Sequence, residues 1–290
     1  MDSIYKMRDR LIAIAKALAM RPILYSLESR FKSQLAEGAG DPVSFTCNIC
    51  SGENRAPREA VQGRETPSCC HCGSTLRFRS VVRAISLALF DKNLALREFP
   101  KAPSLKGVGL TDYWIYAVPL AEKLSYTNTY YHKAPRLDIT RSDEISQESV
   151  DFFVSSDVFE HVPPPVSRTF DNVFRMLKSG GKLIFTVPIS GGEDTQEHFP
   201  DLFEYELRKE KGRYTLVNKT RAGDIQVFDG LRFHGGPGST LEMRCFGRGD
   251  LTDILEESGF CNIRFIDDDE PCHGILWGGD ISAPIIAEKP

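Results

Sequence analysis

The chain has 290 residues, of which 41% are hydrophobic and 26% charged, and its net charge is −4. This composition is that of a globular protein with a sizeable core, and the acidic balance argues against binding nucleic acid over the whole surface. No apolar run is long enough to span a membrane and the N-terminus is a poor secretory signal, so we expect a cytoplasmic protein.

Residues 1–40 are predicted to form an amphipathic helical segment. Its apolar residues recur at helical spacing: Ile4, Met7, Leu11, Ile14 and Leu18. Such a stripe indicates a packed face. The main domain or the second subunit of a homodimer is the favoured partner, and a membrane surface is the alternative.

Residues 41–95 are predicted to form a zinc-knuckle module with a linking helix. Cys47 with Cys50 and Cys69 with Cys72 form two Cys-x-x-Cys pairs, separated by 18 residues. Four thiolates at this spacing suit a tetrahedral structural Zn²⁺ site, which would supply folding energy that the polar segment between the pairs lacks. Inside the second pair, residues 70 and 71 (Cys and His) compete as ligands, and the two-residue spacer favours Cys69 with Cys72.

The first strand of the main domain is expected at 105–110. Gly107 and Gly109 lie near its end, and glycine lets a backbone pass close to a bound ligand. Thr111 and Asp112 follow in the turn. A second strand is expected at 126–131.

The segment 148–188 is the most informative part of the chain. Its apolar run from Val150 to Val154 is typical of a parallel strand that is covered on both faces. Ser155, Ser156 and Asp157 come next, at the carboxyl end of the strand. Ligands bind at that edge in open α/β sheets, so these polar groups are candidate ligand contacts.

A helix is predicted to start at 163–165, in a run of prolines, and to carry an apolar stripe at a spacing of 3.6 residues. Gly180 and Gly181 are expected to end it. The remaining predicted elements are a strand at 183–187, an insertion at about 189–240 with short β-runs at 214–217, 225–228 and 231–233, a helix at 249–258, a strand at 263–266, and a hairpin of 274–277 with 281–287.

The central pattern resembles that of class I S-adenosylmethionine-dependent methyltransferases. Their motif Asp-x-x-x-x-x-x-Val-x-Glu-His-Val, followed by Gly-Gly and an apolar strand, is carried here by Asp151, Val158, Glu160, His161 and Val162. The resemblance implies an α/β fold over residues 96–290, a Rossmann-like seven-stranded sheet with helices on both faces. The Cys-x-x-Cys segment is similar to the N-terminal, zinc-ribbon-like knuckle of a bacterial subgroup of the family.

The resemblance also implies S-adenosylmethionine as cofactor. Asp112 would accept the ammonium group of its amino-acid portion, and Asp138 would serve the adenine end. The full set of predicted cofactor contacts is Gly107, Gly109, Thr111, Asp112, Asp138, Ile139, Ser155, Ser156 and Asp157. The chain departs from the family in keeping only two glycines of the first turn. It also has Tyr130 and Tyr131 where an acidic residue usually binds the ribose.

Two histidines are the candidate catalytic residues, because an imidazole titrates near neutrality and can take the proton of a hydroxyl acceptor. His161 follows the strand that ends in the candidate ligand contacts. His234 stands in a Gly- and Pro-rich loop of the insertion, just before Glu242. His198 and Glu204 are weaker candidates.

Together these features predict a methyltransferase that acts on a small molecule or a saccharide, with O-methylation favoured on the strength of the histidines. Nucleic acid is disfavoured as a substrate. The alternatives are a non-catalytic binding or scaffold protein on a degenerate methyltransferase fold, motivated by the altered turn, and an RNA methyltransferase guided by the basic N-terminal part.

Overall fold

The computed structural model describes residues 41–290 except 235, 237, 280 and 281. The predicted N-terminal helical segment therefore lies outside the described residues, and its partner stays a prediction. Among the described residues, no helix combines the length and the apolar character needed to cross a bilayer.

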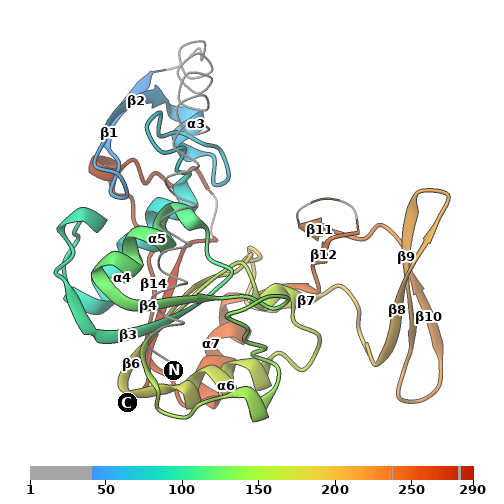
Figure 1. Cartoon of the computed structure of the whole chain (residues 1–290). Coiled ribbons are helices and arrows are strands. Elements are labelled where there is room, and N and C mark those ends of the chain that lie inside the picture. The colour runs from blue at the N-terminus through green and yellow to red at the C-terminus, as the bar shows by residue number, and fades with distance from the viewer. Residues whose placement is uncertain (1–40, 235, 237, 280–281) are drawn as a thin grey trace.

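The centre of the molecule is a six-stranded sheet in the order β14-β15-β6-β5-β3-β4 (Figure 1). Five strands run in one direction, and β15 is antiparallel to both of its neighbours, β14 and β6. The six strands are β3 (Ala102–Leu110), β4 (Leu124–Thr129), β5 (Val150–Ser156), β6 (Leu177–Thr186), β14 (Cys261–Phe265) and β15 (Ile285–Glu288).

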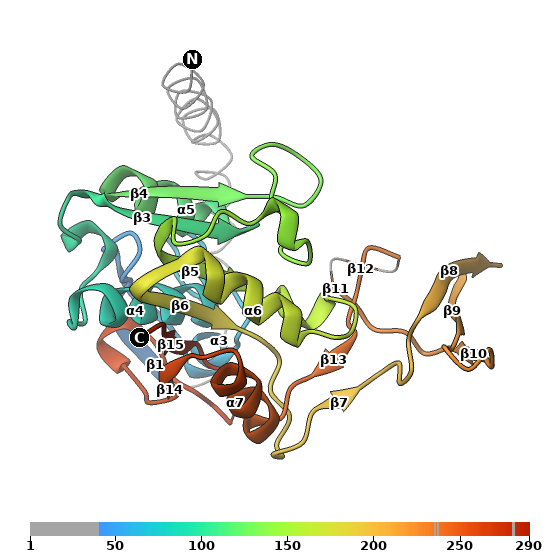
Figure 2. The ribbon, with the colours of Figure 1, turned by 90° about the horizontal axis from the view of Figure 1, so that it is seen from below.

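Helices cover both faces of this sheet (Figure 2). The helix α4 (Leu76–Phe90) and α5 (Trp114–Lys123) belong to one apolar core, and α6 (Ser167–Met176) and α7 (Arg248–Glu257) to the other. Because side chains alternate along a strand, Phe152 of β5 enters the first core and Phe153 the second. The predicted Rossmann-like α/β sheet with helices on both faces is confirmed.

The expected seventh strand is reduced to one contact. After β4, the segment makes only the isolated parallel bridge between Tyr130 and Arg136. Pro135 lies between them and has no N–H to donate to a ladder. The sheet therefore has six strands in place of the predicted seven.

Two boundaries around α6 differ from the prediction. The helix begins at Ser167, because a residue that precedes proline is disfavoured in helical conformation and 163–165 is a run of prolines. It ends at Met176, before the glycines. Gly180, with φ of +74°, lies inside β6, where the pairing with β5 jumps from Val150–Leu177 to Phe152–Lys182. The glycines therefore shape a strand irregularity and do not end the helix.

The predicted terminal hairpin is also wrong in its first arm. Ile275 forms only an isolated bridge with Glu270, next to the short helix η4 (Pro271–His273). The antiparallel partners of β15 are β14 and β6, so the terminal hairpin is β14–β15.

The N-terminal module packs on the first face of the sheet. It contains an antiparallel pair, β1 (Pro42–Thr46) with β2 (Glu53–Pro57), and the short helix α3 (Arg58–Gln62). Its buried residues Phe45 and Val61 belong to the same apolar core as Phe152 of the central sheet. The module and the sheet thus share one core.

The insertion after β6 forms a separate three-stranded antiparallel sheet that projects from the body (Figure 1). Its strands are β8 (Glu204–Glu210), β9 (Arg213–Lys219) and β10 (Ile225–Phe228). Shorter pairs join it to the body: β7 (Gln196–Glu197) with β13 (Arg244–Cys245), and β11 (Phe233–His234) with β12 (Thr240–Leu241). Three short helical turns, η1 (Leu96–Glu98), η2 (Ser142–Glu144) and η3 (Phe159–His161), complete the fold.

Candidate functional site

The carboxyl ends of β3 and β5 lie side by side. The two strands are parallel neighbours, with Gly109 opposite Val154 and Leu110 opposite Ser155. The centre of β5, Phe152 to Val154, is apolar and buried, and Ser155 and Ser156 follow it at this edge. The structure therefore brings the predicted contacts after β3 and after β5 to one edge of the sheet.

The two glycines of β3 make room for side chains of this chain. A Cβ on Gly107 would lie 2.1 Å from the ring of Phe152, and a Cβ on Gly109 would lie 1.8 Å from the Tyr126 hydroxyl. Gly109 would also meet the carboxylate of Asp112, at 2.2 Å. Packing within the chain thus requires glycine at both positions, and contact with a cofactor stays a prediction.

Asp112 turns inward from the tip of β3. It is buried, and its two carboxylate oxygens accept hydrogen bonds from the hydroxyls of Tyr116 and Tyr126. Burial raises the pKa of Asp112 to about 6, although both tyrosines act against the rise. Thr111, just before it, has φ of +54°, a left-handed conformation at the turn where the family usually has glycine.

Replacing Asp112 with asparagine is expected to raise stability at pH 7. Between about pH 4 and 6 the folded chain keeps a proton on this carboxyl that the unfolded chain, with an ordinary pKa near 3.8, has lost, and at pH 7 the folded chain holds a buried charge. Stability contributed by this group therefore falls as the pH rises from 4 through 6, by up to about 3 kcal/mol. In urea unfolding from pH 4 to pH 7, the free energy of unfolding should change less with pH for the variant than for the wild type. Asp143→Asn, which changes an exposed carboxylate, is the control. If the free energy of unfolding of Asp112→Asn depends on pH as steeply as that of this control, Asp112 does not have a raised pKa.

Asp157, at the tip of β5, is clamped by two arginines. Arg64 donates from both terminal nitrogens to its two carboxylate oxygens, at 2.8 and 2.9 Å, and Arg77 Nε lies 3.3 Å away. Thr186 of the neighbouring strand donates a third hydrogen bond at 2.7 Å. Although burial alone would raise the pKa of Asp157, the arginines hold it well below its usual range. The N-terminal module thus reaches the ligand edge of the sheet.

The other predicted cofactor contacts lie near this edge or beyond β4. Ser156 accepts a hydrogen bond from Arg77 at 2.8 Å, whereas the buried Ser155 hydroxyl has no hydrogen-bond partner among the described residues. Asp138 is buried and accepts from the backbone and hydroxyl of Thr140. Ile139 next to it is buried in the second core.

A carboxylate and two imidazoles meet just past the tip of β5. Glu160 Oε1 lies 3.6 Å from His161 Nε2 and 3.7 Å from His234 Nδ1, and the two imidazole rings are perpendicular with centroids 4.6 Å apart. Burial lowers the pKa of His161 and raises that of Glu160 well above its ordinary value. The two predicted catalytic histidines, which are 73 positions apart in sequence, are brought together.

The insertion holds this cluster in place. Glu242 accepts hydrogen bonds from His234 Nε2 and His198 Nε2, both at 2.8 Å. Although burial acts to raise it, these two contacts hold the pKa of Glu242 below its ordinary value. The weaker candidate Glu204 is not part of the cluster, since it is exposed on β8 and pairs with Lys219.

Arg244 is fully buried and braces the backbone of η3. Its terminal nitrogen donates to the carbonyls of Phe159 and Val162, and its Nε pairs with Glu197 at 2.6 Å. The amide of Met243 donates to the carbonyl of Glu160 at 2.8 Å. The segment after the insertion thus fixes where the Glu-His motif stands.

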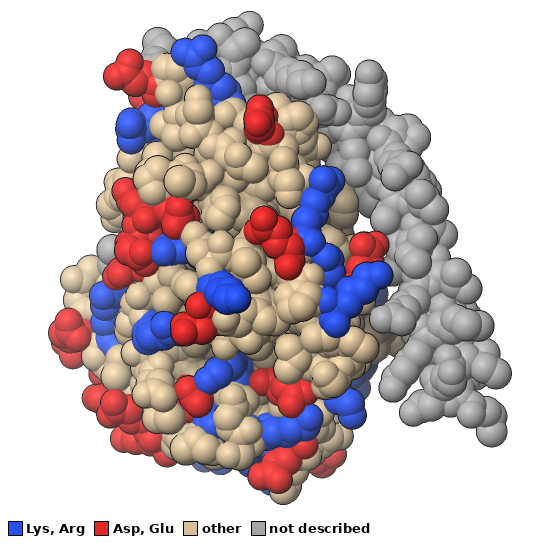
Figure 3. Space-filling view, turned by 90° about the vertical axis from the view of Figure 1, so that its left-hand side faces the viewer, with Lys and Arg blue, Asp and Glu red and all other residues tan. Residues whose placement is uncertain are grey.

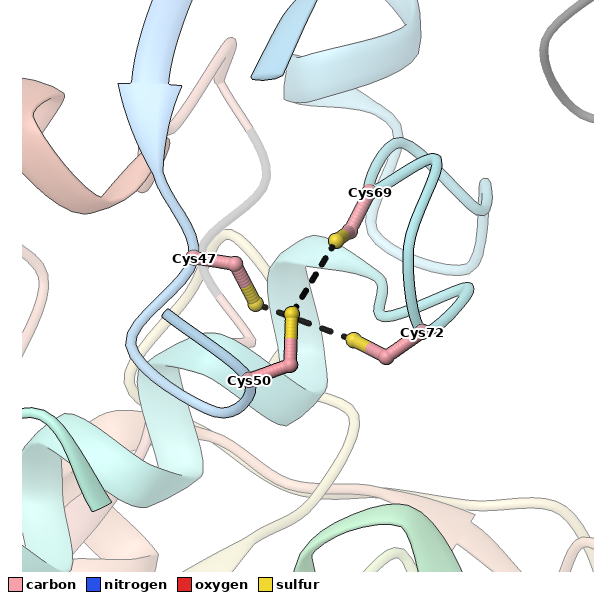
Figure 4. Close-up of side chains that lie close together, drawn as sticks. All are labelled: Cys47, Cys50, Cys69 and Cys72. Carbon is pink, nitrogen blue, oxygen red and sulfur yellow. Dashed lines mark hydrogen bonds between the residues drawn. The ribbon is translucent and has the colours of Figure 1, made fainter. Parts of the chain in front are cut away.

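The four predicted cysteine ligands converge in the N-terminal module (Figure 4). Cys47 and Cys50 come from the β1–β2 turn, and Cys69 and Cys72 from a second turn before α4. Their sulfurs point at one another and all lie within 4.8 Å, with 3.8 Å between Cys47 and Cys72 and 3.6 Å between Cys50 and Cys69. This arrangement suits a tetrahedral thiolate site for one ion.

The competing residues of the second knuckle lie outside this cluster. The backbone N–H of Cys70 donates to Asn54, and His71 Nε2 contacts the carbonyl of Glu53. Arg79 of α4 is buried beside the sulfurs and donates to Ser68, Ser74 and the carbonyl of Gly274. A guanidinium there offsets the negative charge that four thiolates leave around a divalent ion.

Sequence reasoning missed Arg64 and the arrangement of Arg77. The charged, Gly-rich segment around Arg64 gave no periodicity, and no pattern in the predicted linking helix indicated that Arg77 would contact Ser156 and Asp157. The structural role of Arg244 was also missed. The available signal was its position two residues after Glu242, which places both side chains on one face of an extended segment.

Residues 106–185 match the family model described as "Methyltransferase domain". A search of curated proteins gives no match. Similar solved structures include an S-adenosylmethionine dependent methyltransferase from Mesorhizobium loti, at 15% identity, covering 71% of this chain and 100% of that chain with a TM-score of 0.37. Another is a SAM-bound amino pentose methyltransferase from Micromonospora echinaspora, at 12% identity, 75% and 93% coverage, and a TM-score of 0.42.

The matched segment runs from β3 through β6 and includes both strand tips of the candidate site, so this part of the chain is a methyltransferase domain. The sequence predicted a class I S-adenosylmethionine-dependent methyltransferase, and the match to a methyltransferase domain over residues 106–185 agrees with that prediction.

Proposed function

We propose that this chain transfers a methyl group from S-adenosylmethionine to a hydroxyl group of a small molecule or a saccharide. The observation that carries the proposal is the placement of Glu160, His161 and His234 immediately past the tip of β5, beside the tip of β3. In open α/β sheets, ligands bind at this edge.

The residues at the edge suit the cofactor in part. The Ser155 hydroxyl is buried and has no hydrogen-bond partner among the described residues, so its hydrogen-bonding capacity is unused there. Asp138, beyond β4, would serve the adenine end. Tyr130 stands where the family usually has the carboxylate that binds the ribose. Lys133 Nζ lies 4.0 Å from the centroid of the Tyr130 ring, so a phenol and an ammonium group would meet the ribose there.

When bound, S-adenosylmethionine supplies an electrophilic methyl group, and the electrons of the broken C–S bond stay on sulfur as the new O–C bond forms. The residues of this chain have to orient the acceptor and remove its proton. His161 Nδ1 donates to the carbonyl of Leu241 at 2.9 Å, which leaves Nε2 with a lone pair. His161 is also buried enough to stay neutral near pH 7.

A polar hollow next to this cluster is our candidate for the acceptor site. It is lined by His198, Phe199, Phe228, Asp229, Gly230, Leu231 and Arg232. His198 and Arg232 both face Glu242, which connects the hollow to the histidine pair. Aromatic rings beside polar groups are typical of a site for a sugar-like or other small polar molecule.

Charge on the surface gives RNA no preferred track on the face seen in Figure 3. Basic and acidic side chains are interspersed there among the described residues and do not gather into a stripe. Binding of a phosphate backbone needs clustered cations. That face therefore gives no support to the RNA alternative.

We also propose that Cys47, Cys50, Cys69 and Cys72 hold a structural Zn²⁺ ion. The four sulfurs form a closed set, which is typical of structural zinc and leaves no position for a substrate.

The cofactor assignment is tested by calorimetric titration with S-adenosylhomocysteine. We expect one binding event per chain, and about a tenfold weaker affinity for Asp138→Ala, which loses a hydrogen-bond acceptor to the ligand. Asp143→Ala, a change of an exposed carboxylate in η2, is the matched control and should bind as the wild type does. No heat at millimolar ligand, or equal affinity in Asp138→Ala, would refute the assignment.

A further inference from the structure

Glu160 is a buried carboxylate whose oxygens accept no hydrogen bond from another described residue. Its side chain is 0% exposed, and neither oxygen has a hydrogen bond to any described residue. Leaving such a group unsatisfied is costly, and a buried carboxylate is ordinarily paired or bound to a metal. Its nearest polar neighbours, His161 Nε2 and His234 Nδ1, lie at 3.6 and 3.7 Å, too far for hydrogen bonds.

Both histidines direct a lone pair at this carboxylate. His161 Nδ1 must carry a proton, because its partner is the carbonyl of Leu241 and a carbonyl can only accept. His234 Nε2 donates to Glu242, an anion that also faces His198 and Arg232. The nitrogens left toward Glu160 are therefore acceptors, so three electron-pair donors face one another.

We propose that Glu160, His161 and His234 bind a divalent transition-metal ion. Two ligands about 2.1 Å from one ion in tetrahedral geometry are about 3.4 Å apart, close to the two Glu160 distances above. Two imidazoles with one carboxylate are a ligand set for zinc and related ions that leaves a coordination position open.

The surroundings have the form that metal sites require. A metal-bound histidine ordinarily donates its second N–H to a carboxylate or a backbone carbonyl, which fixes its tautomer. Here His234 donates to Glu242 and His161 to the carbonyl of Leu241. Arg244 in turn holds the η3 backbone on which Glu160 stands.

The open position gives the ion a role in the reaction. An acceptor hydroxyl bound there would ionise more readily, because a cation lowers the pKa of a bound oxygen acid. This role rests on the proposed methyl transfer, whereas binding of the ion does not. With the ion bound, His161 Nε2 would be a ligand and no longer a free base, so the proton of the acceptor hydroxyl would pass to solvent while the two histidines position the acceptor oxygen through the ion.

The test is metal stoichiometry of the full chain. Protein carrying its cysteine-bound zinc is treated with a chelator, dialysed, and titrated with Co²⁺ while the visible spectrum is recorded. We expect one Co²⁺ per chain with d–d bands and without the near-ultraviolet bands of thiolate coordination. Affinity should fall on the order of 100-fold or more in both Glu160→Gln and His234→Ala, which each remove a ligand.

His132→Ala changes an exposed histidine and is the matched control, which should bind Co²⁺ as the wild type does. Retained cysteine-bound zinc shows that each variant is folded. No Co²⁺ binding by the wild type, or unchanged affinity in both ligand variants, would overturn the proposal and indicate a protonated, metal-free Glu160. Because no cofactor is present, these results are independent of whether S-adenosylhomocysteine binds.

Discussion

Replacing Cys50 with serine is expected to release the cysteine-bound ion and unfold the N-terminal module. Structural Zn²⁺ contributes on the order of 10 kcal/mol to the folding of small metal-bound modules. The module's own elements are two five-residue strands and a five-residue helix, which cannot replace that contribution. After the chelator treatment that empties the histidine site, zinc content by elemental analysis should fall from one ion per chain in the wild type toward zero in Cys50→Ser, with early loss of structure on heating.

Cys70→Ser is the matched control, because this thiol is next to a ligand and lies outside the cluster. It should keep its zinc and its thermal stability. The two variants together decide between the ligand sets that the spacing of the cysteines left open. Zinc retained in Cys50→Ser, or lost in Cys70→Ser, would show that the ligands are misassigned.

The second large effect is expected from Arg64→Ala. It removes the paired hydrogen bonds to Asp157 and leaves a largely buried carboxylate with Arg77 as its remaining cation and Thr186 as a neutral donor. Breaking a buried ion pair from one side costs about 3–5 kcal/mol, and the remaining cation places this case near the lower value. Denaturant unfolding at pH 7 should show a loss of about 3 kcal/mol.

The effect should also depend on pH. The pKa of Asp157 is depressed in the folded chain, so its contribution is present above the ordinary pKa of 3.8 and is lost as the pH falls below it. The difference in free energy of unfolding between the wild type and Arg64→Ala should therefore become smaller in acid. Arg58→Ala, which removes an exposed arginine of α3, should match the wild type throughout. If this difference in free energy of unfolding stays constant down to pH 3, Arg64 does not act through Asp157.

The parts of the site that follow local rules could be predicted from the sequence. The spacing of the four cysteines fixes two tight turns, and the apolar run of β5 followed by Ser155 fixes a strand with a polar end. Both rest on residues within a few positions of one another. The side-by-side tips of β3 and β5 then follow from the order of strands in the family.

The contacts that complete the site join distant parts of the chain. Arg64 meets Asp157 across 93 positions, and His198 meets Glu242 across 44. No periodicity or turn residue records such pairings, since tertiary packing alone decides them. Gly180 shows the same limit locally: glycine indicates a special backbone conformation, but whether it ends a helix or bends a strand depends on the neighbour that it pairs with.

The most direct test of the whole account is a crystal structure of the zinc-loaded chain with S-adenosylhomocysteine. We predict the ligand at the carboxyl ends of β3 and β5, with its sulfur facing the side where His161 and His234 stand. Density for the ligand at any other place on the protein, or an edge closed by side chains in crystals grown at saturating ligand, would contradict the proposed methyl transfer.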